Sequence, residues 1–280
     1  MRVKVRRVRT RYWRPGTDYI KEILTAVSSL VRDGDIISIS EKAISVAQGN
    51  IIDEGKVNPG PLAQALARFW MRVFWGHFLG FLCRLRRRTI ETLKRYPLEE
   101  GARHKQVALD FAGMLQALRF GSEGGIDSSN LPYSYSCLPL RDPASTAAEI
   151  GNAIRNATGR DVIVLITDSD KTYSLRGFHL SPTYVNFEGI FSGGGFLTYL
   201  MGRFFKMKPR STPKAVYPLG RLHADEALDL AEYSHQIRGH GSGRTVWEMA
   251  ERFGVGLTGV TWEMLEAVDH YPIVLIRRVD

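Results

Sequence analysis

The stretch DVIVLITDSD, residues 161–170, constrains the fold more than any other part of the chain. An unbroken apolar run is followed there at once by acidic residues. A strand without polar alternation is typical of the centre of a sheet that is covered on both faces. A second apolar run, YPIVLIRRV at 271–279, is predicted to be a closing strand. A sheet with helices packed against it is therefore expected.

Helical patterns account for much of the remaining chain. The clearest is 142–161, where Pro143 and Ser145 suit a helix start and Gly159 suits its end. Apolar spacing also predicts helices within 17–35, 61–96, 101–121 and 222–237. The segment 35–49 is interpreted as strand material and 191–214 as a loop or lid. Because helices and strands mix without strict alternation, we expect an α+β fold with mixed or antiparallel sheets.

Composition limits the classes of protein that this chain can belong to. Its 280 residues carry a formal net charge of +9, which suits anionic partners such as nucleotides, nucleic acid or lipid. Two cysteines, Cys83 and Cys137, are too few for a disulfide framework, so a reducing cytoplasm is expected. The aromatic stretch 66–85 is interrupted by Arg68, Arg72 and His77. It is interpreted as an amphipathic or buried helix at the core, a subunit interface or a membrane surface.

Two acidic turns are the strongest candidates for chemistry. GGIDSSN at 124–130 presents Asp127 and Asn130, and ITDSD at 166–170 presents Asp168 and Ser169 at the predicted end of the apolar strand. Carboxylate and hydroxyl oxygens are ligands suited to Mg²⁺ or Mn²⁺. The alternative is purely structural, with the acids serving as turn and cap residues. Glycine-rich stretches at 193–195 and 238–244 suit either phosphate binding or a hinge.

Six short segments in order resemble motifs of the coenzyme F420:γ-glutamyl ligase family. They are GDIISISEKAISVAQG at 34–49, GGIDSSN at 124–130, DPASTA at 142–147, ITDS at 166–169, ADEALDLAEY at 224–233 and PIVLIRR at 272–278. Together they extend over most of the chain. The resemblance implies a two-lobed α+β fold that forms an intertwined homodimer with sites at the subunit boundary. The chain would be a single unit, with 1–120 plus 271–280 as one optional lobe and 121–270 as the other.

The resemblance also implies roles for individual residues. The metal ligands would be Asp127, Asp168 and Ser169, and the nucleotide contacts would be Asn130, Lys42, Arg176, Gly239, Gly241 and Arg244. Mg²⁺ or Mn²⁺ would be the cofactor and GTP or ATP the co-substrate. The implied reaction activates a carboxylate-bearing small molecule as an acyl phosphate, from which an amine displaces phosphate to form an amide.

Departures from the family pattern point to a divergent paralogue with an unknown acceptor. Val46 stands where the family has a lysine, Gln48 replaces an acid, and His240 stands where a metal ligand is expected. These changes motivate a second interpretation, a non-catalytic homologue that binds nucleotides or anions. A third is a nucleic-acid or membrane-surface binder, motivated by the basic N-terminus and the aromatic-basic segment at 66–88.

Overall fold

The computed structural model describes residues 2–121 and 123–279 and is built around one mixed sheet. Its strands are β1 (Arg2–Thr10), β2 (Ile36–Ser40), β5 (Ile163–Leu175), β6 (Phe178–Ser181), β7 (Phe191–Ser192), β8 (Lys208–Tyr217) and β9 (His270–Val279). Their order is β1-β9-β2-β5-β6-β7, with β8 also paired to β5. The β2–β5 and β6–β7 pairs are parallel and the others antiparallel. The expected mixed sheet of an α+β fold is thereby confirmed.

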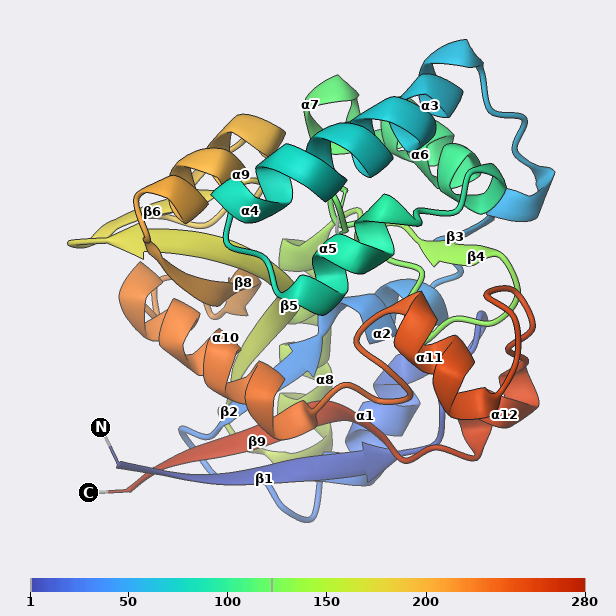
Figure 1. Cartoon of the computed structure of the whole chain (residues 1–280). Helices are drawn as coiled ribbons and strands as arrows, with labels where there is room; N and C mark the ends of the chain where they lie inside the picture. Colours follow the sequence, from blue (N-terminus) through green and yellow to red (C-terminus); the bar gives the residue numbers. More distant parts are fainter. Residues whose placement is uncertain (1, 122, 280) are drawn as a thin grey trace.

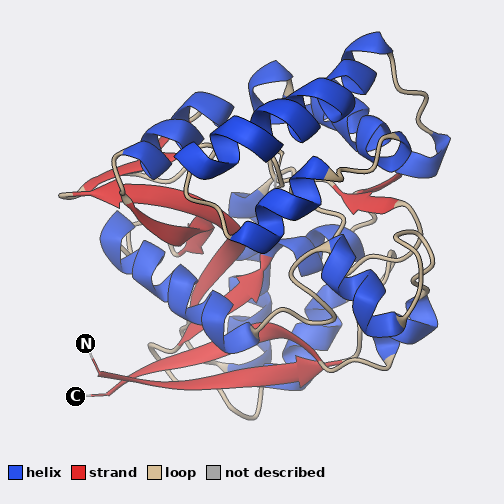
Figure 2. Cartoon of the chain, viewed as in Figure 1, coloured by secondary structure: helices blue, strands red, loops and turns tan. Residues whose placement is uncertain are grey.

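Helices cover both faces of this sheet, as the apolar run at 161–170 predicted (Figures 1 and 2). One face packs against α1 (Tyr19–Val27), α2 (Glu41–Ala47) and α8 (Pro143–Thr158), where Ile39, Ile150 and Ile166 share a buried core. The other packs against α10 (Ala224–Arg238) through a second core that contains Leu165 and Leu228. The β9 strand lies between β1 and β2, so the two chain ends lie side by side.

A helical layer lies above one end of the sheet (Figure 1). It comprises α3 (Pro61–Ala65), the π-helix η2 (Leu66–Leu79), α4 (Gly80–Leu82), α5 (Arg87–Lys94), α6 (Glu99–Ala112), α7 (Met114–Ala117) and α9 (Gly195–Phe204). A small sheet of β3 (Ile51–Asp53) and β4 (Tyr135–Cys137) adjoins it, next to the 3₁₀ turn η1 (Glu54–Lys56). Helices α11 (Val246–Phe253) and α12 (Trp262–Glu266) complete the chain. None of the described helices has the length and apolar character needed to cross a membrane.

Two secondary-structure predictions were wrong. The segment 35–49 is only partly a strand, because residues 41–47 form α2 and bury Ala43, Ile44 and Ala47 at helical spacing in the core. The segment 191–214 is not a lid but contains α9 and most of β8. A Cβ added at Gly195 would lie 2.6 Å from the Leu115 carbonyl oxygen, so this glycine permits tight helix packing and is not a free hinge.

Candidate functional site

The parallel pairing of β2 with β5 brings two carboxylates to one edge of the sheet. Ser40 pairs with Thr167, so the next residues along the two strands, Glu41 and Asp168, are neighbours. Burial raises the pKa of Glu41 to about 7; the charge on Lys214 opposes this rise and the charge on Asp168 adds to it. Glu41 was absent from the sequence-based candidates. The position of this acid directly after the run Ile36–Ser40, inside the segment interpreted as strand material, was the signal that could have identified it.

The sequence analysis predicted that the acids of ITDSD follow the end of a strand, and this prediction was wrong. They lie inside β5, where the pairing with β8 slips between Asp168 and Lys171. Such a β-bulge re-aims side chains without ending the strand. The bulge leaves Ser169 exposed while Asp170 is buried.

A buried lysine balances these acids. Lys214, on β8, places its Nζ 3.4 Å from Asp168 Oδ2 and 3.9 Å from Glu41 Oε2. Burial acts to lower the pKa of Lys214, but the negative charges of Glu41 and Asp168 have the larger effect and raise this pKa. Asp168 Oδ2 is buried and accepts no hydrogen bond from any described residue, and the same is true of Asp170 Oδ2. The four residues Glu41, Asp168, Asp170 and Lys214 are named here the acid cluster.

The GGIDSSN turn lies close to the acid cluster. Asp127 forms an ion pair with Lys42, at 3.0 Å between Oδ2 and Nζ, and accepts a 2.8 Å hydrogen bond from the Ser129 backbone N–H. Burial opposes ionisation, but Lys42 and Ser129 lower the pKa of Asp127. Burial and then the charge on Asp168 raise the pKa of Asp170, with a smaller contribution from Asp127. The charges of the two acidic turns therefore lie close enough to influence one another.

Asn130 anchors a second loop to this turn. Its Oδ1 accepts hydrogen bonds from the backbone N–H and hydroxyl of Ser242, at 2.7 and 2.6 Å, while its Nδ2 donates to the carbonyls of His240 and Gly243, at 3.2 and 2.9 Å. The loop 239–244 is thereby held against the acidic turn. A Cβ at Gly241 would lie 2.6 Å from Asn130 Oδ1, which explains the need for glycine there.

Of the remaining predicted nucleotide contacts, Arg244 and Gly239 lie near the acidic turns and Arg176 does not. Arg244 lines the cavity beside the Asp127 turn and forms a 2.7 Å ion pair with Glu248. Gly239 lies in the exposed part of the anchored loop. Arg176 lies at the exposed tip of the β5–β6 hairpin, eight residues beyond Asp168. At about 3.3 Å per residue this separation is roughly 25 Å, so the structure does not bring Arg176 to the other candidates.

Two arginines that the site prediction did not include, the half-buried Arg238 and the buried Arg119, lie near this region. Arg238, at the end of α10, donates a 2.7 Å hydrogen bond to the Thr167 hydroxyl, while its Nη1 is buried without a partner among the described residues. Burial lowers the pKa of Arg238 to about 10, although Asp168 opposes this shift. The Arg119 side chain is also buried, and its charge lowers the pKa of Asp170 against the effect of burial.

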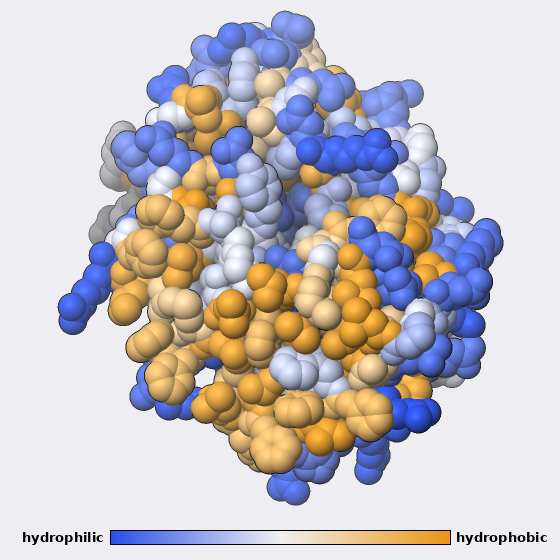
Figure 3. Space-filling model, turned by 90° about the horizontal axis from the view of Figure 1, so that it is seen from above, coloured by the Kyte–Doolittle hydropathy of each residue, from blue (hydrophilic) through white to orange (hydrophobic). Residues whose placement is uncertain are grey.

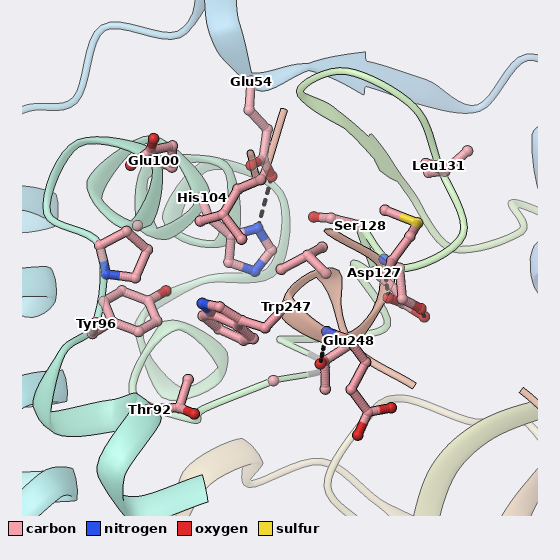
Figure 4. A pocket seen from close by; sticks show the side chains of 18 of the residues that line it. Glu54, Thr92, Tyr96, Glu100, His104, Asp127, Ser128, Leu131, Trp247 and Glu248 are labelled. Atoms are coloured by element: carbon pink, nitrogen blue, oxygen red, sulfur yellow. Dashed lines mark hydrogen bonds and ion pairs between the residues drawn. The ribbon is translucent and has the colours of Figure 1, made fainter. Parts of the chain in front are cut away.

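A cavity of about 410 Å³ opens beside the acidic turns. Asp127 lines it (Figure 4), and so does Ser169, which places the two turns at one cavity. Its opposite walls come from α5, α6 and α11. Tyr96, between α5 and α6, and Trp247 of α11 supply aromatic surface there. This volume is within the range of small-molecule sites.

A charged network supports the cavity wall. His104 Nδ1 lies 2.7 Å from Glu54 Oε1 (Figure 4). Its Nε2 lies 3.2 Å from Glu123 Oε2. The fully buried Lys105 donates a 2.6 Å hydrogen bond to Glu123. Burial opposes protonation, but the two carboxylates raise the pKa of His104 to about 10. The imidazole is therefore held as a cation between them.

The chemistry of the acidic turns suits a divalent cation. Asp127 and Asp168 offer carboxylate oxygens, and Ser169 offers a hydroxyl. Within residues 2–121 and 123–279, the buried Asp168 Oδ2 accepts no hydrogen bond. Within the described residues, no three His, Cys, Asp or Glu side chains form a ready-made metal site. Lysine ammonium groups neutralise the acids in this structure. The donor set therefore fits Mg²⁺ or Mn²⁺ in type, and binding would rearrange the two lysine contacts.

The fold and this site define a mixed α/β protein with a charge-balanced acidic centre beside a small-molecule cavity. The chain belongs to the F420-0:Gamma-glutamyl ligase family, whose model matches residues 7–187. This finding confirms the family resemblance, and the matched range contains the four motifs at 34–49, 124–130, 142–147 and 166–169. It also confirms the expectation of a ligase-type enzyme, because the family is one of ligases.

Individual relatives fall into two groups. An uncharacterized protein of Methanocaldococcus jannaschii is 31% identical over 96% of this chain and 94% of its own length. The coenzyme F420:L-glutamate ligases of Methanopyrus kandleri and Archaeoglobus fulgidus are 29% and 31% identical over 56% and 58% of this chain. The matched regions span 55% and 60% of those two ligases, so the chain resembles little more than half of each.

Proposed function

We propose that this protein is a metal- and nucleotide-dependent ligase that forms an amide bond through an acyl phosphate. The observation that carries the proposal is that Asp127 and Ser169, one from each acidic turn, line the same cavity. The cations Lys42 and Lys214 pair with Asp127 and Asp168 of these turns. Family membership supports the ligase class. Acids that can hold a metal and cations that can face phosphate are the two requirements of phosphoryl transfer.

Asp127, Asp168 and Ser169 would hold Mg²⁺ or Mn²⁺, which when bound neutralises phosphate charge and orients the transfer. Lys42 and Arg238 lie next to those acids and would contact the phosphates of GTP or ATP. The buried, unpartnered Nη1 of Arg238 supports an anionic ligand at this position. Arg244 is a weaker candidate because Glu248 already neutralises it.

The carboxylate-bearing substrate would occupy the cavity between the acidic turns and the wall of α5, α6 and α11. Tyr96 and Trp247 would pack against its apolar part, and Ser128 and Ser129 lie where the carboxylate would approach the phosphoryl donor. The same wall limits water access to the acyl phosphate, which hydrolysis would otherwise consume. We also propose the family's homodimer as the functional form.

For Asn130 and Arg176 we propose roles other than the direct nucleotide contact that the resemblance implied. The side chain of Asn130 is occupied by four hydrogen bonds to the loop 239–244, so it would shape the nucleotide site by holding that loop. Gly239 and Gly241 belong to the loop it holds. Arg176 would take part only as a contribution from another subunit, since it lies on a distant hairpin of its own chain.

Thermal unfolding with Mg²⁺ or Mn²⁺ plus GTP or ATP tests the proposal. A nucleotide at about 100 times its dissociation constant should stabilise the native chain by about 2.7 kcal/mol. Asp127→Asn and Asp168→Asn should lose this gain, whereas the exposed Asp110→Asn should keep it. No stabilisation by any metal–nucleotide pair would contradict the proposal.

A second candidate function is a non-catalytic binder of nucleotides or anions. The complete occupation of Asn130 and the pairing of Arg244 with Glu248 favour it, because both side chains are already satisfied. The discriminating measurement is phosphate release in the presence of carboxylic acids and amines. Release that depends on both co-substrates supports the ligase, while metal-dependent nucleotide binding without release across a broad panel favours the binder.

A further inference from the structure

The helical layer presents a broad apolar surface to solvent (Figure 3). On η2 and α4 the exposed side chains are Phe69, Val73, Phe74, Phe78, Phe81 and Leu82, and on α9 they are Leu197, Met201, Phe204 and Phe205. Met114 and Leu115 of α7 add to them. These residues are named here the apolar face. Phe78 and Phe204 are each 63% exposed, which is unusual for rings of this size.

The helices that carry the apolar face are held side by side. Trp70 of η2 packs edge-on against Phe196 of α9, with ring centroids 5.4 Å apart. Arg203 of α9 donates a 2.9 Å hydrogen bond to the carbonyl of Cys83, just after α4. The tight approach of Gly195 to Leu115 joins α7 to α9. The exposed rings therefore form one preassembled surface.

The interior of the layer does not need these outer rings. Met71, Trp75 and Phe196, on the inner sides of the same helices, already form a buried core cluster. The outward rings of η2 instead follow the wider turn of a π-helix, with Phe69, Phe74 and Phe78 on one side. A contiguous exposed apolar surface rimmed by polar residues is typical of an interaction site.

The charges around the apolar face have one sign. Residues 61–98 contain Arg68, Arg72, Arg84, Arg86, Arg87, Arg88, Lys94 and Arg95 but a single acid, Glu91. On and just after α9, Arg203 and Lys206 add positive charge, and residues 195–207 contain no acid. Arg68, Arg84, Arg86 and Lys206 are exposed and form no ion pair with any described residue. Their charge is therefore available to an anionic partner.

We propose that the apolar face docks onto the surface of an anionic phospholipid bilayer. The aromatic rings would enter the boundary between headgroups and acyl chains, and the basic residues would contact lipid phosphates. Charge decides between this occupant and a second copy of the chain. A twofold contact through this face would bring two basic rims together, whereas an anionic bilayer complements them.

Vesicle flotation tests the proposal with the full chain. The protein should float with vesicles of equal parts phosphatidylcholine and phosphatidylglycerol, not with phosphatidylcholine alone, and binding should weaken in high salt. Phe78→Ser and Phe204→Ser should each weaken binding about tenfold, since each removes a ring from the bilayer. Arg84→Glu with Lys206→Glu should abolish it. Leu219→Ser and Arg221→Glu, at exposed positions outside the apolar face, are the matched controls.

Three results would overturn the proposal. The protein could fail to bind anionic vesicles, or the apolar-face variants could bind as well as the controls. Light scattering could also reveal a dimer that Phe78→Ser dissociates, which would assign the face to a second copy. Circular dichroism and melting of every variant verify that binding losses do not come from unfolding. Because the substituted side chains are exposed, their melting temperatures should match that of the native chain.

Discussion

Lys214 is the residue on which the charge balance of the acid cluster depends. Its side chain is 6% exposed, and its partners Glu41 and Asp168 are also largely buried. Breaking a buried ion pair from one side leaves a charge that neither water nor a partner compensates. The cost of such a change is much greater than the net contribution of the intact pair.

Lys214→Met keeps most of the side-chain volume but removes the charge. We expect it to lower the free energy of unfolding by about 3–5 kcal/mol, measured by urea denaturation near neutral pH. Lys208→Met is the matched control, because its ion pair with Asp229 is exposed on both sides and should contribute less than about 1 kcal/mol. A small loss at Lys214 would mean that the acids are protonated or hydrated.

His104 gives the protein a dependence on alkaline pH. Its pKa is about 10 in the folded chain and 6.5 in the reference state, because Glu54 and Glu123 hold the imidazolium against the effect of burial. A raised pKa means that the stabilisation is complete below about pH 6.5 and is lost as pH rises through about 10. The upper limit of the change is about 5 kcal/mol.

Unfolding free energies measured from pH 6 to 10 should therefore decline steadily in the native chain. Burial lowers the pKa of Lys105. Lys105 therefore opposes part of this decline in stability, because its own deprotonation at high pH removes a buried charge. His104→Gln should lower stability near pH 7 and flatten the profile. A native profile that is already flat over this range would show that His104 is neutral in the folded protein.

At the scale of elements, Gly113 separates two helices that the sequence pattern joined into one. It adopts φ 82° and ψ 173°, a conformation that only glycine enters at low cost, and so divides α6 from α7. A Cβ added at Gly113 would meet nothing within 4 Å. The cost of a substitution there is therefore a backbone cost alone.

Gly113→Ala should lower the free energy of unfolding by about 1–3 kcal/mol, measured by chemical denaturation. Gly256→Ala is the matched control, since it also meets open space but has no positive φ. That change should be neutral or stabilise by up to about 1 kcal/mol. Equal effects at the two positions would contradict the backbone explanation.

Elements defined by a few neighbouring residues could be predicted from the sequence. Helix α8 is an example, because Asp142 caps it, Pro143 begins it and the left-handed Gly159 ends it. Contacts between distant segments decided the elements that the prediction missed. The bulge in β5 depends on its pairing with β8, and α2 turns helical where its apolar residues reach the core of the sheet.

In the candidate site too, residues in local motifs could be predicted from the sequence, whereas residues brought together by the fold could not. The acidic turns were identified from their residues, and the structure brings Asp127 and Ser169 to one cavity. Glu41 and Lys214 were missed because strand register and strand order bring them to Asp168, and neither can be read from a short motif. Arg176 matched a motif locally, yet it lies at the tip of the long hairpin formed by β5 and β6, far from the acidic turns.

At the scale of the whole molecule, β5 joins the parts that the sequence analysis treated as two optional lobes. Its first half, Ile163–Thr167, pairs with β2, and its second half pairs with β6. The β8 strand pairs with β5 on both sides of the bulge, from Val164 to Ser174. Neither part can lose its sheet pairing without disturbing the strand that both share.

The chain should therefore unfold in one cooperative transition and not lobe by lobe. Scanning calorimetry should give a calorimetric enthalpy equal to the van't Hoff enthalpy, which is the test of a two-state process. Ile166→Asn, at a fully buried position of β5, should shift the whole transition to lower temperature without splitting it, because it buries an amide in the shared strand. Two resolved transitions in the native chain, or a split peak in the variant, would show that the lobes fold independently despite the strand they share.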